Sequence, residues 1–210
     1  MSTEDTKQES SDISRRGFLK GVGAGAVATG ILQGPSEVKE VAAQASPGTH
    51  GPGDLTITLN INGEDKRLTV EPRVTLLDAM RNRLDTTGAK KVCDRGACGA
   101  CTVLLDGEPV YSCSMLAVEA EGRKITTVEG LGTPEQMSDV QELFVKHDGL
   151  QCGFCTPGFV VATTAFVKDN PGATLEEVRD GLGGNLCRCG SYQGITQAAL
   201  EAAQKLKGGV

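Results

Sequence analysis

Four cysteines between positions 93 and 113 constrain this chain more than any other feature of its sequence. Three of them, Cys93, Cys98 and Cys101, lie on one short segment that reads Cys-Asp-Arg-Gly-Ala-Cys-Gly-Ala-Cys. The fourth, Cys113, follows after eleven intervening residues. A fold that contains this segment must gather three thiols on one loop and return a fourth thiol to it.

The C-x4-C-x2-C spacing is the one with which plant-type ferredoxins hold a 2Fe-2S cluster, with the fourth ligand arriving from further along the chain. A loop around so small a group must curl tightly. Gly96 and Gly99 permit this, because glycine has no Cβ and tolerates positive φ. Inward-pointing amides then stabilise the thiolates and tune the reduction potential. The residues alone leave two alternatives open, a zinc knuckle and a pair of disulfides.

The beginning of the chain has the character of an export leader. Residues 1–13 are mostly polar or charged, with little apolar surface to bury. The twin arginine Arg15-Arg16 then precedes a weakly hydrophobic, glycine-rich and alanine-rich run from Gly21 to Leu32, as in a bacterial twin-arginine signal. This run is too short and glycine-rich for a transmembrane helix. It is not preceded by a strand, as a dinucleotide-binding loop would require.

We therefore predict a twin-arginine signal peptide over residues 1–45, cleaved after Ala45, and a linker over residues 46–54. This predicts a periplasmic protein that engages the twin-arginine translocase during export. Cysteines in an oxidising compartment usually form disulfides. The twin-arginine route, however, carries proteins that take up cofactors before export, so a metal cluster is compatible with this address.

Without the predicted signal peptide, roughly 165 residues remain, which is enough for two small domains. The formal net charge of −6 at pH 7 argues against a nucleic-acid partner. Because the chain has no Trp and only 3% aromatic residues, its cores must be aliphatic. Thin cores of this kind suit small domains that metal centres stiffen.

The first domain is predicted over residues 55–130. The stretch from Leu55 to Ile61 alternates apolar and polar residues, which indicates a strand. Asn62-Gly63 is a strong hairpin signal, and the second strand is expected from Lys66 to Glu71. A helix from Leu76 to Leu84, capped by Thr75, should cross the sheet.

After the cysteine loop, the strand from Thr102 to Leu105 is followed by an Asp106-Gly107 turn and a return through Val110. This hairpin should deliver Cys113 back to the loop. A last short strand is expected from Lys124 to Val128. The first domain is therefore predicted to be a plant-type, ferredoxin-like β-grasp, within an α+β protein.

The second domain, over residues 131–210, is predicted to be a four-helix bundle, because the apolar period changes from two to 3.6 near Gly130. The first expected helix is capped by Ser138, and the second follows Pro157. The third begins at the capping box of Thr174, and the fourth runs from Ile195 to Leu206.

This bundle carries the other four cysteines. They occur as Gln151-Cys152-Gly-Phe-Cys155 and as Cys187-Arg-Cys189. A C-x2-C pair and a C-x-C pair, each at a helix end or glycine turn, form a second candidate four-thiolate site. The eight cysteines then divide into two sets of four with none left over. Zinc remains an alternative occupant of either set.

The two histidines are not assigned a role. A Rieske centre needs two histidines and two cysteines for one cluster, and His50 and His147 belong to no such motif. His50 lies in the linker, and His147 is predicted to be a solvated residue at a helix end. The sequence also contains no recognisable nucleophile with its base, no paired carboxylates and no phosphate loop, so no catalytic residue is predicted.

The two cysteine motifs, in this order, resemble those of the small iron-sulfur subunit of the molybdenum hydroxylases, the xanthine oxidase family. The resemblance covers nearly all of the chain from about Leu55 onward. With its twin-arginine leader, the chain is most similar to the iron-sulfur subunits of periplasmic aldehyde oxidoreductases. It departs from the family pattern at Val92, where glycine often precedes the first cysteine, which puts the local backbone path in question.

The resemblance implies a division of labour among subunits. A large subunit would hold a molybdenum-pterin cofactor and hydroxylate an aldehyde to a carboxylic acid, and a further subunit would hold FAD. The alternative substrates are purines such as xanthine, or N-heterocycles such as isoquinoline or nicotinate. Electrons would pass through a 2Fe-2S cluster in the helical domain to a plant-type 2Fe-2S cluster and on to FAD. The implied ligands are Cys152, Cys155, Cys187 and Cys189 for the first of these clusters and Cys93, Cys98, Cys101 and Cys113 for the second.

By the same resemblance, Gln151 and Cys189 match positions that approach the pterin of the molybdenum cofactor. The alternative for Gln151 is a polar residue at a helix C-terminus that hydrogen-bonds to the backbone. Three classes of function thus remain to be separated: an electron-transfer subunit, a structural zinc protein and a disulfide-stabilised binding module.

Overall fold

The computed structural model describes residues 51–208, so the predicted signal peptide and most of its linker lie outside the described residues. The described residues belong to one compact unit. None of the helices within residues 51–208 has both the length and the apolar character needed to cross a membrane.

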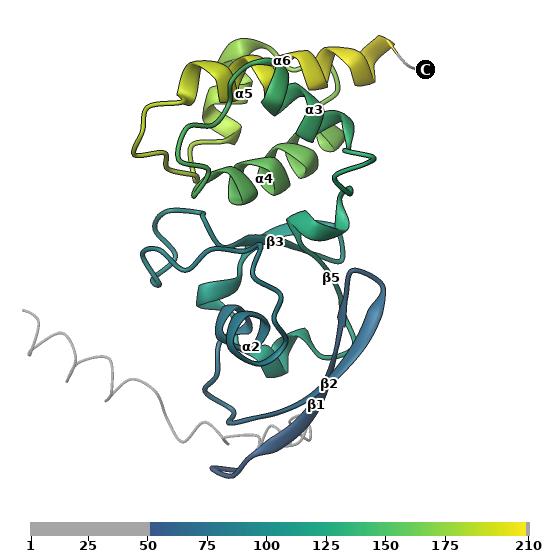
Figure 1. Ribbon diagram of the computed structural model, residues 1–210, viewed down its shortest axis with the longest axis vertical. Coiled ribbons are helices and arrows are strands. Elements are labelled where there is room, and N and C mark those ends of the chain that lie inside the picture. Colours follow the sequence, from purple (N-terminus) through teal and green to yellow (C-terminus); the bar gives the residue numbers. More distant parts are fainter. Residues whose placement is uncertain (1–50, 209–210) are drawn as a thin grey trace, which may run out of the picture. The chain divides into compact units, whose positions relative to one another are not determined.

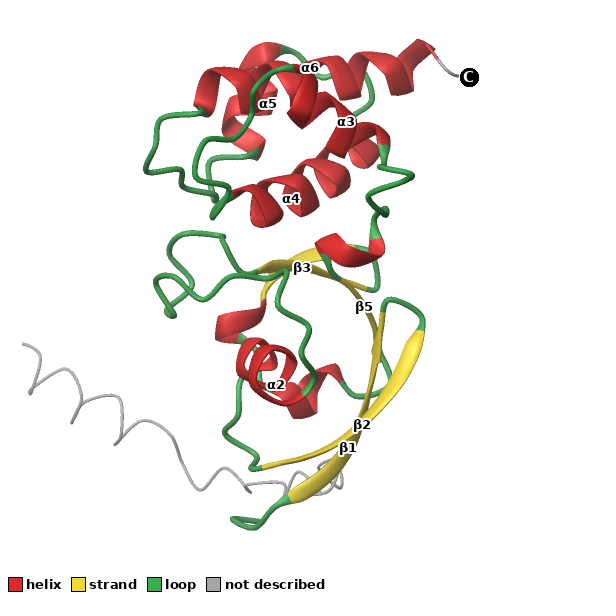
Figure 2. Ribbon diagram, in the orientation of Figure 1, coloured by secondary structure: helices red, strands yellow, loops and turns green. Residues whose placement is uncertain are grey.

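The first part of the described chain forms a five-stranded mixed sheet in the order β2-β1-β5-β3-β4 (Figure 2). The central pair β1 and β5 is parallel, and the other neighbouring pairs are antiparallel. The strands are β1 (Leu55–Ile61), β2 (Glu64–Val70), β3 (Thr102–Leu105), β4 (Glu108–Tyr111) and β5 (Lys124–Thr126).

Both predicted hairpin turns are present. Asn62 and Gly63 have φ of 54° and 85°, and Asp106 and Gly107 have φ of 55° and 96°. Positive φ at both central residues is the requirement of a type I′ turn, which matches the twist of the flanking strands. Because the first turn has only two residues, β2 begins at Glu64, directly opposite Ile61 and earlier than the predicted Lys66.

Strand β5 is shorter than predicted, since the chain leaves the sheet before Val128. The side-chain oxygen of Asn62 accepts a 2.9 Å hydrogen bond from the backbone N–H of Thr127. The backbone N–H of Thr127 is therefore bonded to a side chain instead of a neighbouring strand. After Thr127 the chain forms a 3-10 helix, η3 (Val128–Gly130). The physical cause of the early end is therefore a tertiary hydrogen bond.

Helix α2 (Leu76–Arg83) packs its apolar residues into an aliphatic core with the sheet. Leu76, Leu77 and Met80 are fully buried, and each such side chain contributes about 1.5–3 kcal/mol relative to exposure. As predicted, the Thr75 side chain caps the helix by accepting a 3.2 Å hydrogen bond from the Asp78 N–H.

Four further helices occur in the described residues after the sheet (Figure 1). They are α3 (Asp139–Lys146), α4 (Thr156–Asp169), α5 (Leu175–Gly181) and α6 (Tyr192–Gly208). Ser138 and Thr174 form capping boxes with Gln141 and Glu177, respectively. Two starts differ from the prediction. Helix α4 includes Pro157 in its first turn, where the missing N–H costs little, and α6 begins at Tyr192 rather than Ile195.

The helices have their own apolar core, which includes Leu143, Phe144 and Phe159. A smaller cluster joins this part to the sheet, because Leu104 of β3 packs against Val161 and Ala165 of α4. This contact brings the start of α4 close to the cysteine loop that precedes β3.

Candidate metal centres

The first cysteine set lies on the loop between α2 and β3 and on the segment after β4. Cys113 belongs to the 3-10 helix η1 (Ser112–Ser114), which follows β4 directly. The hydroxyl of Ser112 donates a 2.7 Å hydrogen bond to the carbonyl of Cys101. The β3–β4 hairpin therefore returns Cys113 to the loop, as the sequence predicts.

Backbone amides of this loop point at the cysteine sulfurs. The N–H of Gly96 donates to Cys113 Sγ at 3.2 Å, and the N–H of Ala97 donates to Cys93 Sγ at 3.4 Å. Gly96 and Gly99 both have a φ of 69°, which lets the loop curl inward. The expected role of the glycines is thus present in the geometry.

The thiols of the first set have different acidities. A backbone hydrogen bond from Arg95, helped by the neighbouring Cys98 thiol, lowers the pKa of Cys93 to about 7. Burial raises the pKa of Cys101 to about 12. The pKa of Tyr111 is also raised, first by burial and then by charge on Cys101, Cys98, Cys113 and Cys93. The charges of all four thiols therefore act on the Tyr111 hydroxyl.

The second set is assembled from two loops that each precede a helix. Cys155 is the N-cap residue of α4, and Cys187 and Cys189 lie between α5 and α6. The Cys152 thiol neighbours that of Cys189, and the Cys155 thiol neighbours that of Cys187. Cys187 is buried, whereas Cys152 and Cys189 are exposed. The two motifs that the sequence pairs do meet in space.

Local hydrogen bonds also act on the second set. Burial raises the pKa of the Cys155 thiol to about 12. Burial alone would raise the pKa of Cys187 too, but hydrogen bonds from the backbone of Ser191 and from Cys155 bring it below its ordinary value. Stabilised thiolates of this kind are the form in which cysteine binds metals.

The donor sets fit a two-iron cluster. All eight cysteines carry free thiols, and inward amides serve the sulfurs of both sets. The buried hydroxyls of Thr156 and Ser191, both beside cysteines of the second set, have no hydrogen-bond partner. Within residues 51–208, no three His, Cys, Asp or Glu side chains are close enough to hold a single metal ion. A two-iron cluster, in contrast, distributes four thiolates over two metal atoms.

Comparisons with known proteins agree with this geometry. Residues 59–128 match the family model of a 2Fe-2S iron-sulfur cluster binding domain, and residues 127–200 match that of a 2Fe-2S binding domain. The iron-sulfur-binding subunit PaoA of an Escherichia coli K12 aldehyde oxidoreductase is 39% identical over 96% of this chain and 93% of its own length. The chain belongs to the iron-sulfur small subunits of the molybdenum hydroxylases.

Other members of the family act on different compounds. The small subunit of nicotine 6-hydroxylase from Paenarthrobacter nicotinovorans is 46% identical over 73% of this chain and 93% of its own. A chain of quinoline 2-oxidoreductase from Pseudomonas putida 86 superimposes with a TM-score of 0.67 and 43% identity, covering 72% of this chain and 97% of that one. Members of this family are subunits of molybdenum-containing oxidoreductases.

In this family member, the two cysteine sets are joined directly. The backbone N–H of Leu186, next to Cys187, donates a 2.9 Å hydrogen bond to the carbonyl of Cys98. The buried side chain of Asn185 donates to the carbonyl of Gly99 at 3.0 Å. Sequence reasoning missed Asn185, although its place after Gly183-Gly184 and just before a cysteine pair is a signal that could have found it.

Three other residues from the sequence analysis have clear positions. Gln151 is exposed beside Cys152. Val92 is 54% exposed and is not among the residues with positive φ, so the backbone there does not require glycine. His147 does end α3 as its C-cap, but it is not fully solvated, because its Nε2 lies 2.7 Å from Glu201 Oε2 in a half-buried contact between α3 and α6.

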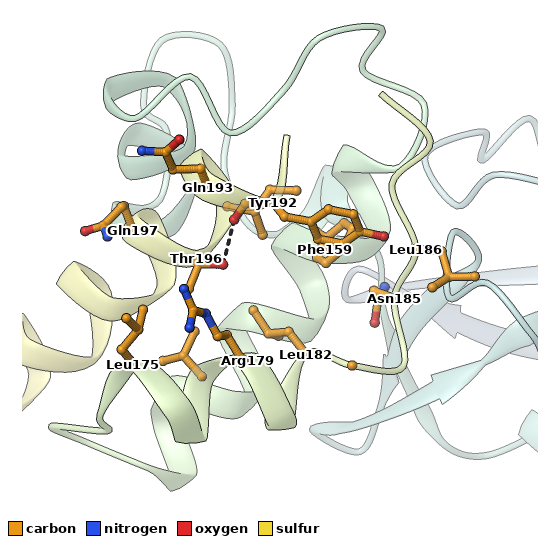
Figure 3. Close-up of a pocket in the computed structure, with 13 residues that line it drawn as sticks. Phe159, Leu175, Arg179, Leu182, Asn185, Leu186, Tyr192, Gln193, Thr196 and Gln197 are labelled. Atoms are coloured by element: carbon orange, nitrogen blue, oxygen red, sulfur yellow. Dashed lines mark hydrogen bonds between the residues drawn. The ribbon is translucent and has the colours of Figure 1, made fainter. Parts of the chain in front are cut away.

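A cavity of about 650 Å³ lies beside the second set, between α5, α6 and the loop before Cys187 (Figure 3). Phe159 and Tyr192 line it and pack edge to face, with ring centroids 6.2 Å apart. The Tyr192 hydroxyl accepts a 2.8 Å hydrogen bond from the N–H of Cys187. This cavity contains none of the eight cysteines, so it borders the candidate centre without forming it.

Proposed function

We propose that this chain is the electron-transfer subunit of a periplasmic, molybdenum-dependent aldehyde oxidoreductase and that it holds two 2Fe-2S clusters. When bound, such clusters accept and release one electron at a time. The observation that carries the proposal is the pair of four-cysteine sets joined by the hydrogen bond from Leu186 to Cys98. The proposed ligands are Cys93, Cys98, Cys101 and Cys113 in one set and Cys152, Cys155, Cys187 and Cys189 in the other.

The contact between the sets gives electrons a short route through the chain. Leu186 is covalently adjacent to Cys187, and its amide touches the carbonyl of Cys98. A single hydrogen bond therefore connects Cys98, a proposed ligand of one set, to Leu186, the residue before Cys187 of the other set. The chain itself would conduct electrons and would leave the bond chemistry to a partner.

The exposed edge of the second set supports a proposal for where the partner binds. Cys152 and Cys189 are exposed, as is Gln151 beside them. We propose that a large molybdenum-pterin subunit covers this edge and that Gln151 and Cys189 contact its pterin. A FAD subunit would accept electrons on the other side. The similarity to the small subunits of aldehyde oxidoreductase and nicotine 6-hydroxylase supports larger partners.

An aldehyde is the favoured substrate class because the match to the Escherichia coli aldehyde oxidoreductase subunit extends over 96% of this chain, including most of its first 50 residues. That match also supports export by the twin-arginine pathway, for which the Arg15-Arg16 motif is the direct argument. The second candidate is an N-heterocycle, since the nicotine 6-hydroxylase small subunit is more similar over a shorter region, with 46% identity.

The test is to purify the native complex from the periplasm by a tag on this chain and to record metals and low-temperature EPR after dithionite reduction. We expect about four irons per chain on the two-cluster arithmetic, two distinct rhombic signals, and molybdenum with co-purifying larger subunits. Cys101→Ser should remove one signal and Cys187→Ser the other, so each variant is the control for its counterpart. A lone chain with zinc, or with no metal, would contradict the proposal.

The pterin contact needs its own variant. Gln151→Ala should slow the first electron transfer in rapid-reaction kinetics while both EPR signals and the iron content stay unchanged. Loss of iron in this variant would show that Gln151 is structural instead. A screen of aldehydes against N-heterocycles with the wild-type complex then decides between the two substrate classes.

A further inference from the structure

Three side-chain hydroxyls within residues 51–208 are buried and make no hydrogen bond: those of Thr156, Thr163 and Ser191. An unsatisfied buried polar group destabilises the fold, so such groups are rare and call for an explanation. Two of the three stand next to proposed ligands of the second cluster. Thr156 follows Cys155 directly, and Ser191 comes two residues after Cys189.

Ser191 occupies a helix cap without acting as one. Its carbonyl accepts the 3.0 Å hydrogen bond from the N–H of Ile195 that opens α6. A serine at this place normally uses its hydroxyl to accept an amide of the first turn, as Ser138 does at α3. The Ser191 hydroxyl makes no such bond, although the side chain is only 6% exposed. Ser191 is followed by Tyr192, whose hydroxyl accepts a 2.8 Å hydrogen bond from the N–H of Cys187, so the Ser191 side chain lies close to the proposed site.

Thr156 is in a comparable position at the first residue of α4. A threonine within a helix often donates its hydroxyl to the carbonyl four residues earlier, and Thr164 does so to Val160 at 2.8 Å. Thr156 has no helical carbonyl behind it, because Cys155 is the N-cap of α4. Its buried hydroxyl therefore retains a proton without an acceptor in the described residues.

The first cysteine set differs in this respect. The hydroxyl of Thr102 donates to the carbonyl of Gly99 at 2.6 Å, and the hydroxyl of Ser112 donates to that of Cys101. These buried hydroxyls are satisfied by the protein itself. Of the two sets, only the second has neighbouring buried hydroxyls without an acceptor among residues 51–208. It lies at the N-termini of α4 and α6, where positive helix ends favour negative charge.

We propose that the hydroxyls of Ser191 and Thr156 donate hydrogen bonds to sulfur atoms of the second cluster and thereby raise its reduction potential. The inference rests on the proposed ligand set of Cys152, Cys155, Cys187 and Cys189. Hydrogen bonds to the sulfurs stabilise the more negative, reduced form of a cluster, which makes reduction easier. Ser191 and Thr156 are thus positioning and tuning residues rather than ligands.

The test is an EPR-monitored redox titration of the full complex with Ser191→Ala, Thr156→Val and the double variant. The midpoint potential of one 2Fe-2S signal should shift to more negative values in each single variant and further in the double variant. The other signal should not move, and the iron content should equal that of the wild type. Ser191→Thr and Thr156→Ser keep the hydroxyl and should restore a potential close to that of the wild type.

Thr163→Val is the matched control. Thr163 has the same buried, unsatisfied hydroxyl on the same helix as Thr156. It lies seven residues further along α4, about 10 Å along the helix axis. This variant should leave both potentials unchanged.

Unchanged potentials in both Ser191→Ala and Thr156→Val, with two signals and full iron, would overturn the inference and leave the proposed function intact. A wild-type complex without two signals would instead overturn the proposed function. If Ser191→Ala fails to take up iron, the comparison of Thr156→Val with Thr156→Ser decides the matter, because valine keeps the shape of threonine without its hydroxyl and serine keeps the hydroxyl without the methyl group.

Discussion

The side-chain amide of Asn185 donates a 3.0 Å hydrogen bond to the backbone carbonyl of Gly99, which lies 86 residues earlier in the chain. Asn185 is only 5% exposed. The neighbouring Leu186 amide bonds Cys98, and the Tyr111 hydroxyl donates to the carbonyl of Gly184 at 2.8 Å. Three hydrogen bonds therefore fasten the loop of one cysteine set to the first domain.

Asn185→Ala should destabilise the holoprotein by about 0.5–1.5 kcal/mol, because the buried carbonyl of Gly99 would lose the Asn185 hydrogen bond and keep the one from the Thr102 hydroxyl. Thermal unfolding followed by circular dichroism measures the change. Asn170→Ala is the control: the Asn170 side chain also donates to a backbone carbonyl, that of Phe166 at 2.9 Å, but in an exposed position. We expect little effect there, and an equal loss in both variants would argue against a special role for Asn185.

Gly158→Ala should loosen the same junction by a steric route. Alanine normally favours a helix over glycine by about 1 kcal/mol. At this position in α4, however, an added Cβ would overlap the carbonyl oxygen of Gly99 and lie 3.0 Å from the Cα of Ala100. Both neighbours are backbone atoms and cannot move independently of the cysteine loop. The expected results are a lower melting temperature and a broadened EPR signal of the first cluster.

Gly208→Ala is the matched control for this substitution, since Gly208 also lies in a helix, α6, and a Cβ there would meet nothing within 4 Å. It should be neutral or slightly stabilising. Equal melting temperatures of Gly158→Ala and the wild type would show that the junction can absorb a methyl group.

The ion pairs at Glu201 should give part of the stability a defined pH dependence. Hydrogen bonds from Lys146, and then from His147, hold the pKa of Glu201 below its ordinary value. A carboxyl group with a depressed folded-state pKa stabilises the fold above its unfolded pKa, and this contribution is lost as the pH falls through the folded pKa. Glu201→Gln should therefore be less stable than the wild type at pH 7, and the difference should vanish in acid.

Unfolding curves at a series of pH values from 7 downward measure this difference. Glu176→Gln, which changes an exposed carboxylate on α5, serves as the control and should track the wild type throughout. A gap between Glu201→Gln and the wild type that stays constant with pH would assign the effect to packing between α3 and α6 rather than to charge.

Much of the local structure could be predicted because it depends on neighbouring residues. Asn62-Gly63 and Asp106-Gly107 tolerate the positive φ of two-residue turns. Thr75 reaches an amide only three residues away. Two of the errors occur where distant residues intervene: Asn62 ends β5 early by binding Thr127, and the contact with Glu201 keeps His147 from being fully exposed to solvent.

The sequence by itself determined the grouping of eight cysteines into two sets and the order of strands before helices, because ligand spacing and apolar periodicity are short-range properties of a chain. Only the tertiary structure decided which groups hold the two sets together, as Asn185 and Gly99 show. It also decided which hydroxyls stay without a partner, as at Ser191 and Thr156. Such contacts depend on how separate segments pack, and a local signal such as the glycines before Asn185 does not say which distant residue it will meet.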